Sequence, residues 1–302
     1  MLSRKISATL NFSFRGRRCQ SLKFLSTEVV VNKRPEPQVA DSLLQIGTRR
    51  IFQHEHDMYR ELCRNFYKDH VIPFHSEWEE QGQVDREVWK KAGENGMLCV
   101  TMPEQYGGLG LDILYAAVHW EEQSYAGTSG PGWHLHSEIV APYILHYGTE
   151  EQKMKYLPAM CSGEKISAIA MTEPGAGSDL AGMRTTATKD GDYYVLNGSK
   201  TYITNGYLSD VVIVCAKTDP TKGAKGISLF LVDADTPGFT KGRKLKKMGM
   251  KVVLVSVAFG TIAGLICFNY SRPRTLQSFS LKMFVFIRAL YWERKTKGSF
   301  TS

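Results

Sequence analysis

A glycine-rich segment in the middle of the chain carries the groups that a phosphorylated ligand needs. Residues 170–182 read AMTEPGAGSDLAG and overlap the end of an apolar run at 166–171, so a buried strand is expected to open into a tight loop. Glycine tolerates a positive φ and lets main-chain N–H groups approach an anion. Thr172 and Ser178 add hydroxyls for a polar ring edge or a phosphate. The segment therefore predicts a loop that binds a phosphorylated cofactor.

Two other interpretations of this loop are weaker. A dinucleotide-binding fingerprint built on Gly175 and Gly177 needs a third glycine or alanine three positions later, an opening helix and an acidic strand end about 20 residues on. Leu180 occupies that third position, and residues 185–188 favour a strand. An ordinary glycine-rich turn in a β protein is the other alternative, since such turns are common. A turn of that kind does not explain a second motif that follows downstream.

The second motif is YITNG at residues 202–206. In order and spacing, the two motifs resemble the two flavin-binding elements of the acyl-CoA dehydrogenase family. The likeness runs from about residue 46 to 250 and points to the mitochondrial long-chain-specific members, through GPGW at 130–133 and the runs 208–214 and 226–232. The resemblance implies an FAD enzyme of mitochondrial fatty-acid β-oxidation, which converts a long-chain fatty acyl-CoA to the trans-2-enoyl-CoA. Electron-transfer flavoprotein would then accept the electrons.

The resemblance also assigns residues to the site. It implies flavin contacts from Ile169, Ala170, Met171, Thr172, Gly177, Ser178, Tyr202, Ile203 and Thr204. It implies contacts with the CoA substrate from Ser178, Ala224 and Lys225. In the family a general-base Glu takes the α-hydrogen while hydrogen bonds to the thioester oxygen stabilise the developing charge. That base lies in a second helical domain, so no catalytic residue is expected among the residues of this sequence, and no metal ligand either.

Residues 251–302 show no motif that resembles the family and are expected to lie outside the likeness. Residues 252–270 contain no charge, and the basic stretch after them has Glu293 as its one acid. Three interpretations are open: a membrane-spanning helix, a substitute core strand or helix, and an alternative or read-through end unrelated to the fold. The last is favoured. The sequence thus predicts a truncated family member of impaired activity, in which the family's homotetramer is doubtful; a non-catalytic product that associates with full-length subunits, or a membrane-anchored variant, is the alternative.

The elements that must position these motifs suggest an α+β protein. Residues 49–164 predict an all-α domain, with a first helix from about Ile51 that Pro73 ends, caps at Asp85 and Asp112, and a helix near 135–147. Thr149 with Gln152, three residues later, predicts a capping box for the last helix. Residues 165–250 predict short strands with turns at 190–191, 197–198 and 205–206, which indicate a small antiparallel β-barrel or sandwich.

Charge is uneven along the 302 residues, whose net charge is +8. Residues 1–27 carry six bases, no acid and scattered apolar residues, which predicts a mitochondrial transit peptide and a place in the matrix; a disordered basic tail is the alternative. Residues 28–48 are expected to form a linker. Residues 28–240 carry 29 acids against 19 bases, and an acidic middle argues against nucleic-acid binding.

Cysteine and histidine positions suggest packing rather than chemistry. The six cysteines contain no CxxC pair, so neither a disulfide framework nor a zinc site is expected. His54 and His56 lack the i, i+4 spacing of paired ligands and are expected on a solvated face. His134 and His136 are expected to make local contacts. Glu121 and Glu122 are expected on the wet side of a helix.

Overall fold

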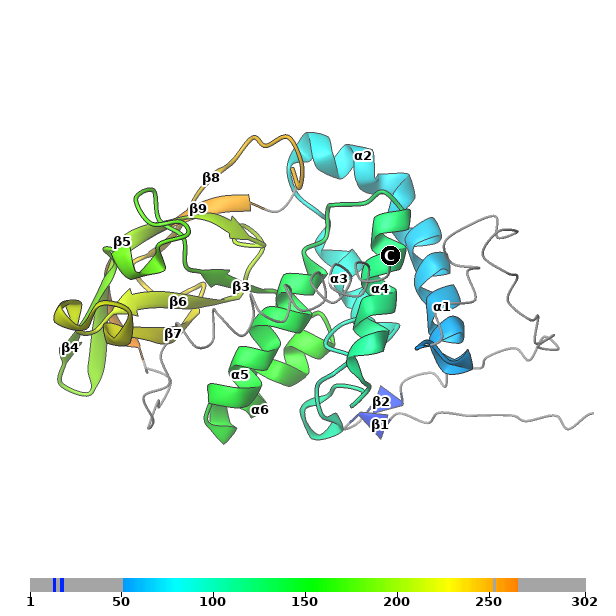
Figure 1. Ribbon diagram of the computed structural model, residues 1–302, viewed down its shortest axis with the longest axis horizontal. Coiled ribbons are helices and arrows are strands. Elements are labelled where there is room, and N and C mark those ends of the chain that lie inside the picture. Colours follow the sequence, from blue (N-terminus) through cyan, green and yellow to red (C-terminus); the bar gives the residue numbers. More distant parts are fainter. Residues whose placement is uncertain (1–12, 15–16, 19–50, 252–253, 266–302) are drawn as a thin grey trace, which may run out of the picture.

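A layer of helices and a curled β-sheet lie side by side in the computed structural model, which describes residues 13–14, 17–18, 51–251 and 254–265 (Figure 1). The linker predicted at 28–48, most of the predicted transit peptide and residues 266–302 fall outside the described residues. From residues 1–27 the structure describes only β1 (Ser13–Phe14) and β2 (Arg17–Arg18), which pair antiparallel. The predicted order of an all-α domain followed by a β domain is confirmed.

The helical domain contains the elements α1 (His54–His70), α2 (Ile72–Gln81), α3 (Arg86–Glu94), η3 (Glu104–Tyr106), α4 (Ile113–Tyr125), η4 (Leu135–Val140), α5 (Ala141–Tyr147) and α6 (Glu150–Cys161). Capping residues in the sequence correctly predicted where several of these helices begin. Asp112 caps α4 by accepting from the Leu114 N–H at 2.8 Å. Thr149 and Gln152 form the predicted capping box of α6, with bonds of 2.9 and 3.2 Å. Asp85 stands at the N-cap of α3, although its side chain makes no capping hydrogen bond.

Two helical details differ from the prediction. Helix α1 ends at His70, but Pro73 lies in the first turn of α2 instead of closing the helical region. Proline is tolerated there because a first-turn N–H has no intrahelical acceptor. The helix expected near 135–147 is present as two parts, since η4 is a π-helix and only α5 is α-helical.

The helical core is rich in aromatic rings, and polar groups of α1 and α4 are buried beside it. Trp133, Trp89 and Tyr67 are almost fully buried. Glu122 is 2% exposed and binds Arg60 and Arg64 of α1 at 3.1 and 3.0 Å, so its expected place on the wet side was wrong. Two guanidinium groups explain its burial, because α1 packs against α4 although the two helices are far apart in sequence.

His56 is a second correction in the helical domain. Its side chain is buried, although a solvated face was expected for residues 54–56. The His56 Nδ1 accepts the Gln53 N–H at 3.0 Å, and the ring lies 4.5 Å from that of Tyr115. Ring contacts with α4 and the capping bond together remove this histidine from solvent.

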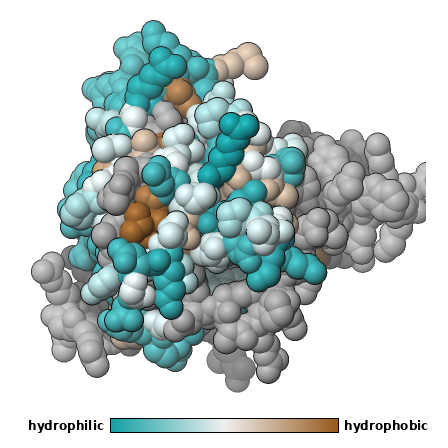
Figure 2. All heavy atoms as spheres, turned by 90° about the vertical axis from the view of Figure 1, so that its left-hand side faces the viewer, coloured by the Kyte–Doolittle hydropathy of each residue, from teal (hydrophilic) through white to brown (hydrophobic). Residues whose placement is uncertain are grey.

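The β domain consists of β3 (Ser167–Ala170), β4 (Thr186–Asp190), β5 (Tyr193–Thr204), β6 (Val211–Lys217), β7 (Ile227–Asp233), β8 (Phe239–Lys244) and β9 (Leu254–Leu265). The strand order is β3-β6-β4-β5-β9-β8, with β7 paired to β6. Most pairings are antiparallel, as predicted, and β6 runs parallel to β3 and β4. The face of the molecule at the β-domain end is largely hydrophilic, with small apolar patches (Figure 2).

Strand β5 corrects one predicted turn. Gly191, at φ 58°, makes the predicted hairpin between β4 and β5, but residues 197–198 lie within a single twelve-residue strand. Gly198 pairs with Phe259 of β9, and a Cβ there would lie 2.4 Å from the Thr185 Oγ1. Only glycine fits at position 198 because Thr185 lies so close to its backbone. A glycine inside a strand can mark such a close approach instead of a turn.

Part of the uncharged segment at 252–270 is a strand. β9 lies between β5 and β8, pairs antiparallel with both, and buries Val257. Of the three interpretations of this segment, a core strand is the one that the described portion supports. Among the described residues, no helix has the length and apolar character needed to cross a bilayer.

Two buried polar side chains join the domains. The Ser167 N–H donates to His136 Nδ1 at 3.1 Å, so His136 Nε2 carries the proton and donates to the Met160 carbonyl at 3.0 Å. Asn205 Nδ2 donates to the Gly132 carbonyl at 2.8 Å and to the Ser167 carbonyl at 3.2 Å. Local contacts were expected for His136, but its hydrogen-bond partners Met160 and Ser167 are distant in the chain, and Ser167 belongs to the first strand of the β domain.

Basic side chains at the periphery add further contacts between the domains. Arg86 of α3 donates to the Leu208 carbonyl at 3.1 Å and also binds the Asp210 carboxylate. Lys244, at the end of β8, donates to the carbonyl of Gln81 at 3.1 Å and to the side chain of Gln83 at 3.0 Å. The β domain is therefore held against the helical domain both in the core and at the periphery. These contacts fix the position of the glycine-rich loop that follows β3.

Candidate functional site

The two motifs singled out in the sequence are neighbours in space. The glycine-rich loop, residues 171–184, leaves the end of β3 and closes on itself through reciprocal bonds between Glu173 and Ala176 at 3.0 and 3.1 Å. The Thr201 N–H, on β5, donates to the Thr172 carbonyl at 2.9 Å. The loop and the end of β5 therefore form one continuous surface with Thr172 beside Tyr202.

The end of β5 exposes an aromatic ring from a strained backbone. Tyr202 is 58% exposed while Ile203 is 1% exposed, so these two successive side chains point to opposite faces of the strand. Tyr202 has φ 58°, and Asn205 has φ 63°. A bulky residue in this region carries strain that is common at binding sites. The Lys247 Nζ lies 5.9 Å from the Tyr202 ring centroid and places a positive charge near the face of this ring.

The predicted flavin contacts divide into exposed and buried sets. Thr172 and Met171 are half-buried, while Gly177 and Ser178 are exposed on the loop. Added Cβ atoms at Gly175 and Gly177 would meet open space, so the main chain is accessible there. The hydroxyls of Thr172 and Ser178 make no hydrogen bond within the described part of the chain. These free donors and accessible N–H groups fit a ligand with a polar ring edge and phosphates.

The remaining predicted contacts lie deeper. Ala170 and Ile203 pack in the core of the β domain, and Ile169 is 9% exposed on β3. For Ala170 and Ile203, only the main chain can face a ligand. Thr204 is half-buried, and its methyl group would lie 2.9 Å from a Cβ at Gly132, so glycine at 132 admits β5 against the helical domain.

The predicted substrate contacts lie at one end of the β domain. The loop contains the short helix η5 (Leu180–Gly182), which contacts η6 (Pro220–Gly226). Ala224 is half-buried and Lys225 is exposed in η6. The structure thus brings the loop that carries Ser178 next to the segment of Ala224 and Lys225, where an exposed ammonium could bind a phosphate.

A buried ion pair under the loop was missed in the sequence. The Lys200 Nζ binds Glu173 Oε1 at 2.8 Å, and neither side chain is more than 6% exposed. Burial alone would raise the pKa of Glu173, but hydrogen bonds from Lys200, Thr185 and backbone N–H groups outweigh it and lower the pKa to about 2. The available signal was a carboxylate inside the loop motif and a lysine two residues before Tyr202. Their spacing in sequence could not show the pairing.

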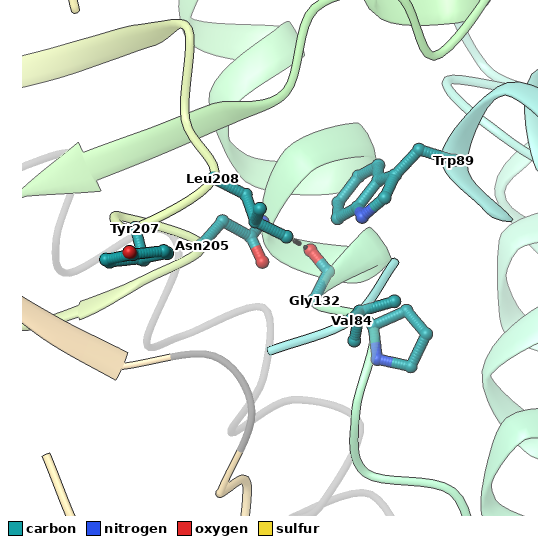
Figure 3. Close-up of a pocket in the computed structure, with 7 residues that line it drawn as sticks. Val84, Trp89, Gly132, Asn205, Tyr207 and Leu208 are labelled. Atoms are coloured by element: carbon teal, nitrogen blue, oxygen red, sulfur yellow. Dashed lines mark hydrogen bonds between the residues drawn. The ribbon is translucent and has the colours of Figure 1, made fainter. Parts of the chain in front are cut away.

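A small pocket lies beside the exposed end of β5 (Figure 3). Its lining comes from both domains and comprises Val84, Trp89, Pro131, Gly132, Asn205, Tyr207 and Leu208. The Oδ1 of Asn205 and the Nε1 of Trp89 are buried without a partner among the described residues. The pocket therefore lies at the junction of the two domains, and two of its lining side chains carry these unpaired polar atoms. It was not predicted from the sequence.

Metal chemistry and thiol chemistry find no support in the described part of the chain. No group of three or more His, Cys, Asp or Glu side chains is placed there to hold a metal ion. Cys63, Cys99, Cys161 and Cys215 are free and buried. Burial raises the pKa of Cys215 to about 12, which keeps this thiol near the ion pair protonated.

Comparison with known proteins agrees with this geometry. The family model "Acyl-CoA dehydrogenase, N-terminal domain" matches residues 53–164, and the model "Acyl-CoA dehydrogenase, middle domain" matches residues 168–257. The long-chain specific acyl-CoA dehydrogenase of mitochondria from Mus musculus is 56% identical over 220 residues, which are 72% of this chain and 51% of that protein. The chain thus spans about half the length of the curated relatives it matches.

Solved structures with the same arrangement include two bacterial proteins. An acyl-CoA dehydrogenase from Geobacillus kaustophilus superposes with a TM-score of 0.69 at 50% identity, covering 71% of this chain and 57% of that one. A glutaryl-CoA dehydrogenase from Mycobacterium smegmatis, in complex with FADH2, gives a TM-score of 0.64 at 31% identity, covering 72% and 55%. Both likenesses extend over the helical and β domains together.

Proposed function

The chain belongs to the acyl-CoA dehydrogenase family, and we propose that its two described domains form the FAD-binding and acyl-CoA-binding part of a long-chain acyl-CoA dehydrogenase site. The observation that carries this proposal is the hydrogen bond from the Thr201 N–H to the Thr172 carbonyl. It joins the two motifs into one surface with an exposed aromatic ring and free hydroxyls. A long-chain fatty acyl-CoA is the proposed substrate, and the trans-2-enoyl-CoA the product.

The residues at this surface would hold and orient the cofactor. The Thr172 hydroxyl would donate to the polar edge of the isoalloxazine, and Tyr202 would cover part of the ring. Main-chain N–H groups near Gly177, with the Ser178 hydroxyl, would bind phosphate oxygens. Lys225 would offset phosphate charge on the CoA. Bound FAD would supply the acceptor for the hydrogen that leaves Cβ as hydride.

The acid groups of the loop are not built to take a proton from Cα. Glu173 accepts hydrogen bonds from Lys200, Thr185 and the Arg184 N–H, and its pKa is about 2. A carboxylate so engaged is a poor base. Asp179 is exposed on the loop, where water solvates its carboxylate and competes with a substrate for hydrogen bonds to it. We therefore propose that the residues of this loop bind the reactants while contributing little to proton abstraction.

A reconstitution assay tests this function. The purified chain is mixed with FAD, a long-chain acyl-CoA and an artificial electron acceptor, beside a complete relative such as the mouse enzyme. We expect FAD to bind and turnover to be at least about 100-fold lower than in the complete relative, because the acids of the loop are poor bases and a general base contributes at least about this factor. Failure to bind FAD would contradict the proposed function, and turnover equal to the relative's would contradict the proposed impairment.

The proposed setting follows from the mitochondrial relatives. The matrix is the proposed location, and electron-transfer flavoprotein is the proposed electron acceptor. Import of the full chain fused to a fluorescent protein would test the location, and a reporter that stays outside mitochondria would contradict it.

A further inference from the structure

Glu173 connects both ends of the glycine-rich loop. Its Oε1 accepts the Thr185 N–H at 3.0 Å and the Thr185 hydroxyl at 2.6 Å, and its Oε2 accepts the Arg184 N–H at 2.6 Å. Lys200 reaches the same carboxylate from β5 and also donates to the Met171 carbonyl at 3.0 Å. One ion pair therefore fixes the beginning of the loop, its end and the neighbouring strand.

The pair also lies directly under the two residues that face the proposed ligand. Glu173 follows Thr172 in the chain, and Lys200 precedes Tyr202 by two residues. The pairing of β5 with β9 shifts register between Lys200 and Ile203, so Lys200 points inward although Tyr202 points outward. Lys200 on one side and buried Ile203 on the other thus hold the strained backbone of Tyr202 in place.

Stability alone does not explain a charged pair at this depth. The Lys200 side chain is 0% exposed and that of Glu173 is 6% exposed, so both charges have lost most of their hydration. Apolar residues of similar volume often serve stability equally well in such places, whereas an ion pair fixes one geometry through directed bonds. The apolar groups needed for packing are already supplied by Ala176, Met183 and Cys215.

We propose that Glu173 and Lys200 are positioning residues for the cofactor, which set the separation of Thr172 and Tyr202 without contacting the ligand themselves. The inference rests on the proposed FAD function for its binding measurement. A second measurement, amide hydrogen exchange in the FAD-free protein, does not depend on that function.

Lys200→Met is the principal variant. It removes the ammonium but leaves Glu173 with its three other donors, so the loop retains most of its bonds. We expect the Kd for FAD to rise at least about tenfold, by analogy with the loss of metal affinity when a hydrogen-bond partner of a metal ligand is removed. We also expect a changed visible spectrum of bound flavin, and faster exchange of the Thr201 amide in the FAD-free protein.

Lys155→Met is the matched control. It makes the same chemical change in an exposed pair, where the Lys155 Nζ binds Asp233 at 2.7 Å away from the loop. We expect its FAD affinity, flavin spectrum and Thr201 exchange to match the wild type. If Lys200→Met does not fold, Thr185→Val removes one donor to Glu173 while keeping both charges, and a several-fold loss of affinity is expected.

The outcomes separate the two proposals. A Lys200→Met protein whose FAD affinity and Thr201 exchange equal those of the wild type would overturn the positioning role, even if its melting temperature fell. A wild-type protein that does not bind FAD would overturn the proposed function instead. In that case unchanged Thr201 exchange in Lys200→Met would still overturn the anchoring of the loop, and faster exchange would support it.

Discussion

Two glutamates, buried Glu173 in the β domain and half-buried Glu138 in the helical domain, have carboxyl pKa values shifted in opposite directions. Glu173, under the loop of the β domain, is surrounded by donors and its pKa is lowered to about 2. Glu138, on the π-helix η4, has its Thr101 Oγ1 contact at 3.5 Å, and burial raises its pKa to about 7. Nearby on the chain, burial lowers the pKa of His134 to about 4. The β domain fixes the charge of Glu173 to hold a loop, whereas the environment of Glu138 and His134 in the helical domain disfavours the charged form of each side chain.

The comparison predicts different responses to pH. A lowered carboxyl pKa contributes stability above the ordinary value of 4.5, and that stability is lost as the pH falls toward 2. A raised carboxyl pKa works the other way, because the folded state holds a proton that the unfolded state releases. Glu138 therefore costs stability as the pH rises from 4.5 to about 7. His134 contributes stability above 6.5 that is lost as the pH falls toward 4.

The largest expected effect comes from removing the charge at Glu173. Glu173→Leu keeps a similar volume but leaves Lys200 buried without its counter-ion, which costs roughly 3–5 kcal/mol in the free energy of unfolding. Urea unfolding at pH 7 measures this loss. Glu87→Leu, which removes an exposed pair with Lys90, should change the same quantity by less than about 1 kcal/mol. Equal losses in the two variants would remove the distinction on which the comparison depends.

A smaller effect of opposite sign is expected at Glu138. Glu138→Gln keeps the shape and removes the need to ionise, so at pH 8 it should stabilise the folded state by on the order of 2 kcal/mol. At pH 4 both residues are neutral and the two proteins should have equal stability. Thermal melts across this pH range provide the measurement. A gain that is the same at both pH values would contradict the raised pKa of Glu138.

The smallest expected effect concerns the strained backbone at Tyr202. Tyr202→Gly relieves a left-handed conformation worth roughly 1–2 kcal/mol but adds the entropic cost of glycine, so stability should rise by about 0.5 kcal/mol. FAD affinity should fall, because the ring is lost. Tyr207→Gly is the matched control: Tyr207 is also exposed but has no positive φ, so glycine there should lower stability. A stability loss in Tyr202→Gly would show that its backbone is not strained.

Local signals in the sequence were enough for elements whose partners are near in the chain. The capping box of Thr149 and Gln152, the cap at Asp112 and the turn at Gly191 each depend on contacts within a few residues. The order of the two domains, and the likeness of the two motifs to those of one family, followed from matched patterns over long stretches. These features were therefore predictable.

Features decided by distant partners were not. Gly198 is a strand glycine because β9 pairs with it, about sixty residues later, and because Thr185 packs on it. Glu122 is buried because α1 supplies Arg60 and Arg64, and Glu173 pairs with a lysine of another strand. From the sequence alone, the uncharged segment 252–270 could have formed a helix or a strand. Pairing with β5 and β8 makes part of it the strand β9. Such pairings are set by tertiary structure, which no window of sequence reveals.

The most direct test of the account is a titration of FAD into the purified full chain, followed by flavin fluorescence and visible absorbance. The account predicts saturable quenching and a shifted flavin spectrum in the wild type, with weaker binding in Thr172→Val, whose hydroxyl is removed while the fold is kept. Flavin fluorescence that is unchanged at saturating FAD, in a protein shown to be folded, would contradict the claim that these two motifs form a flavin site.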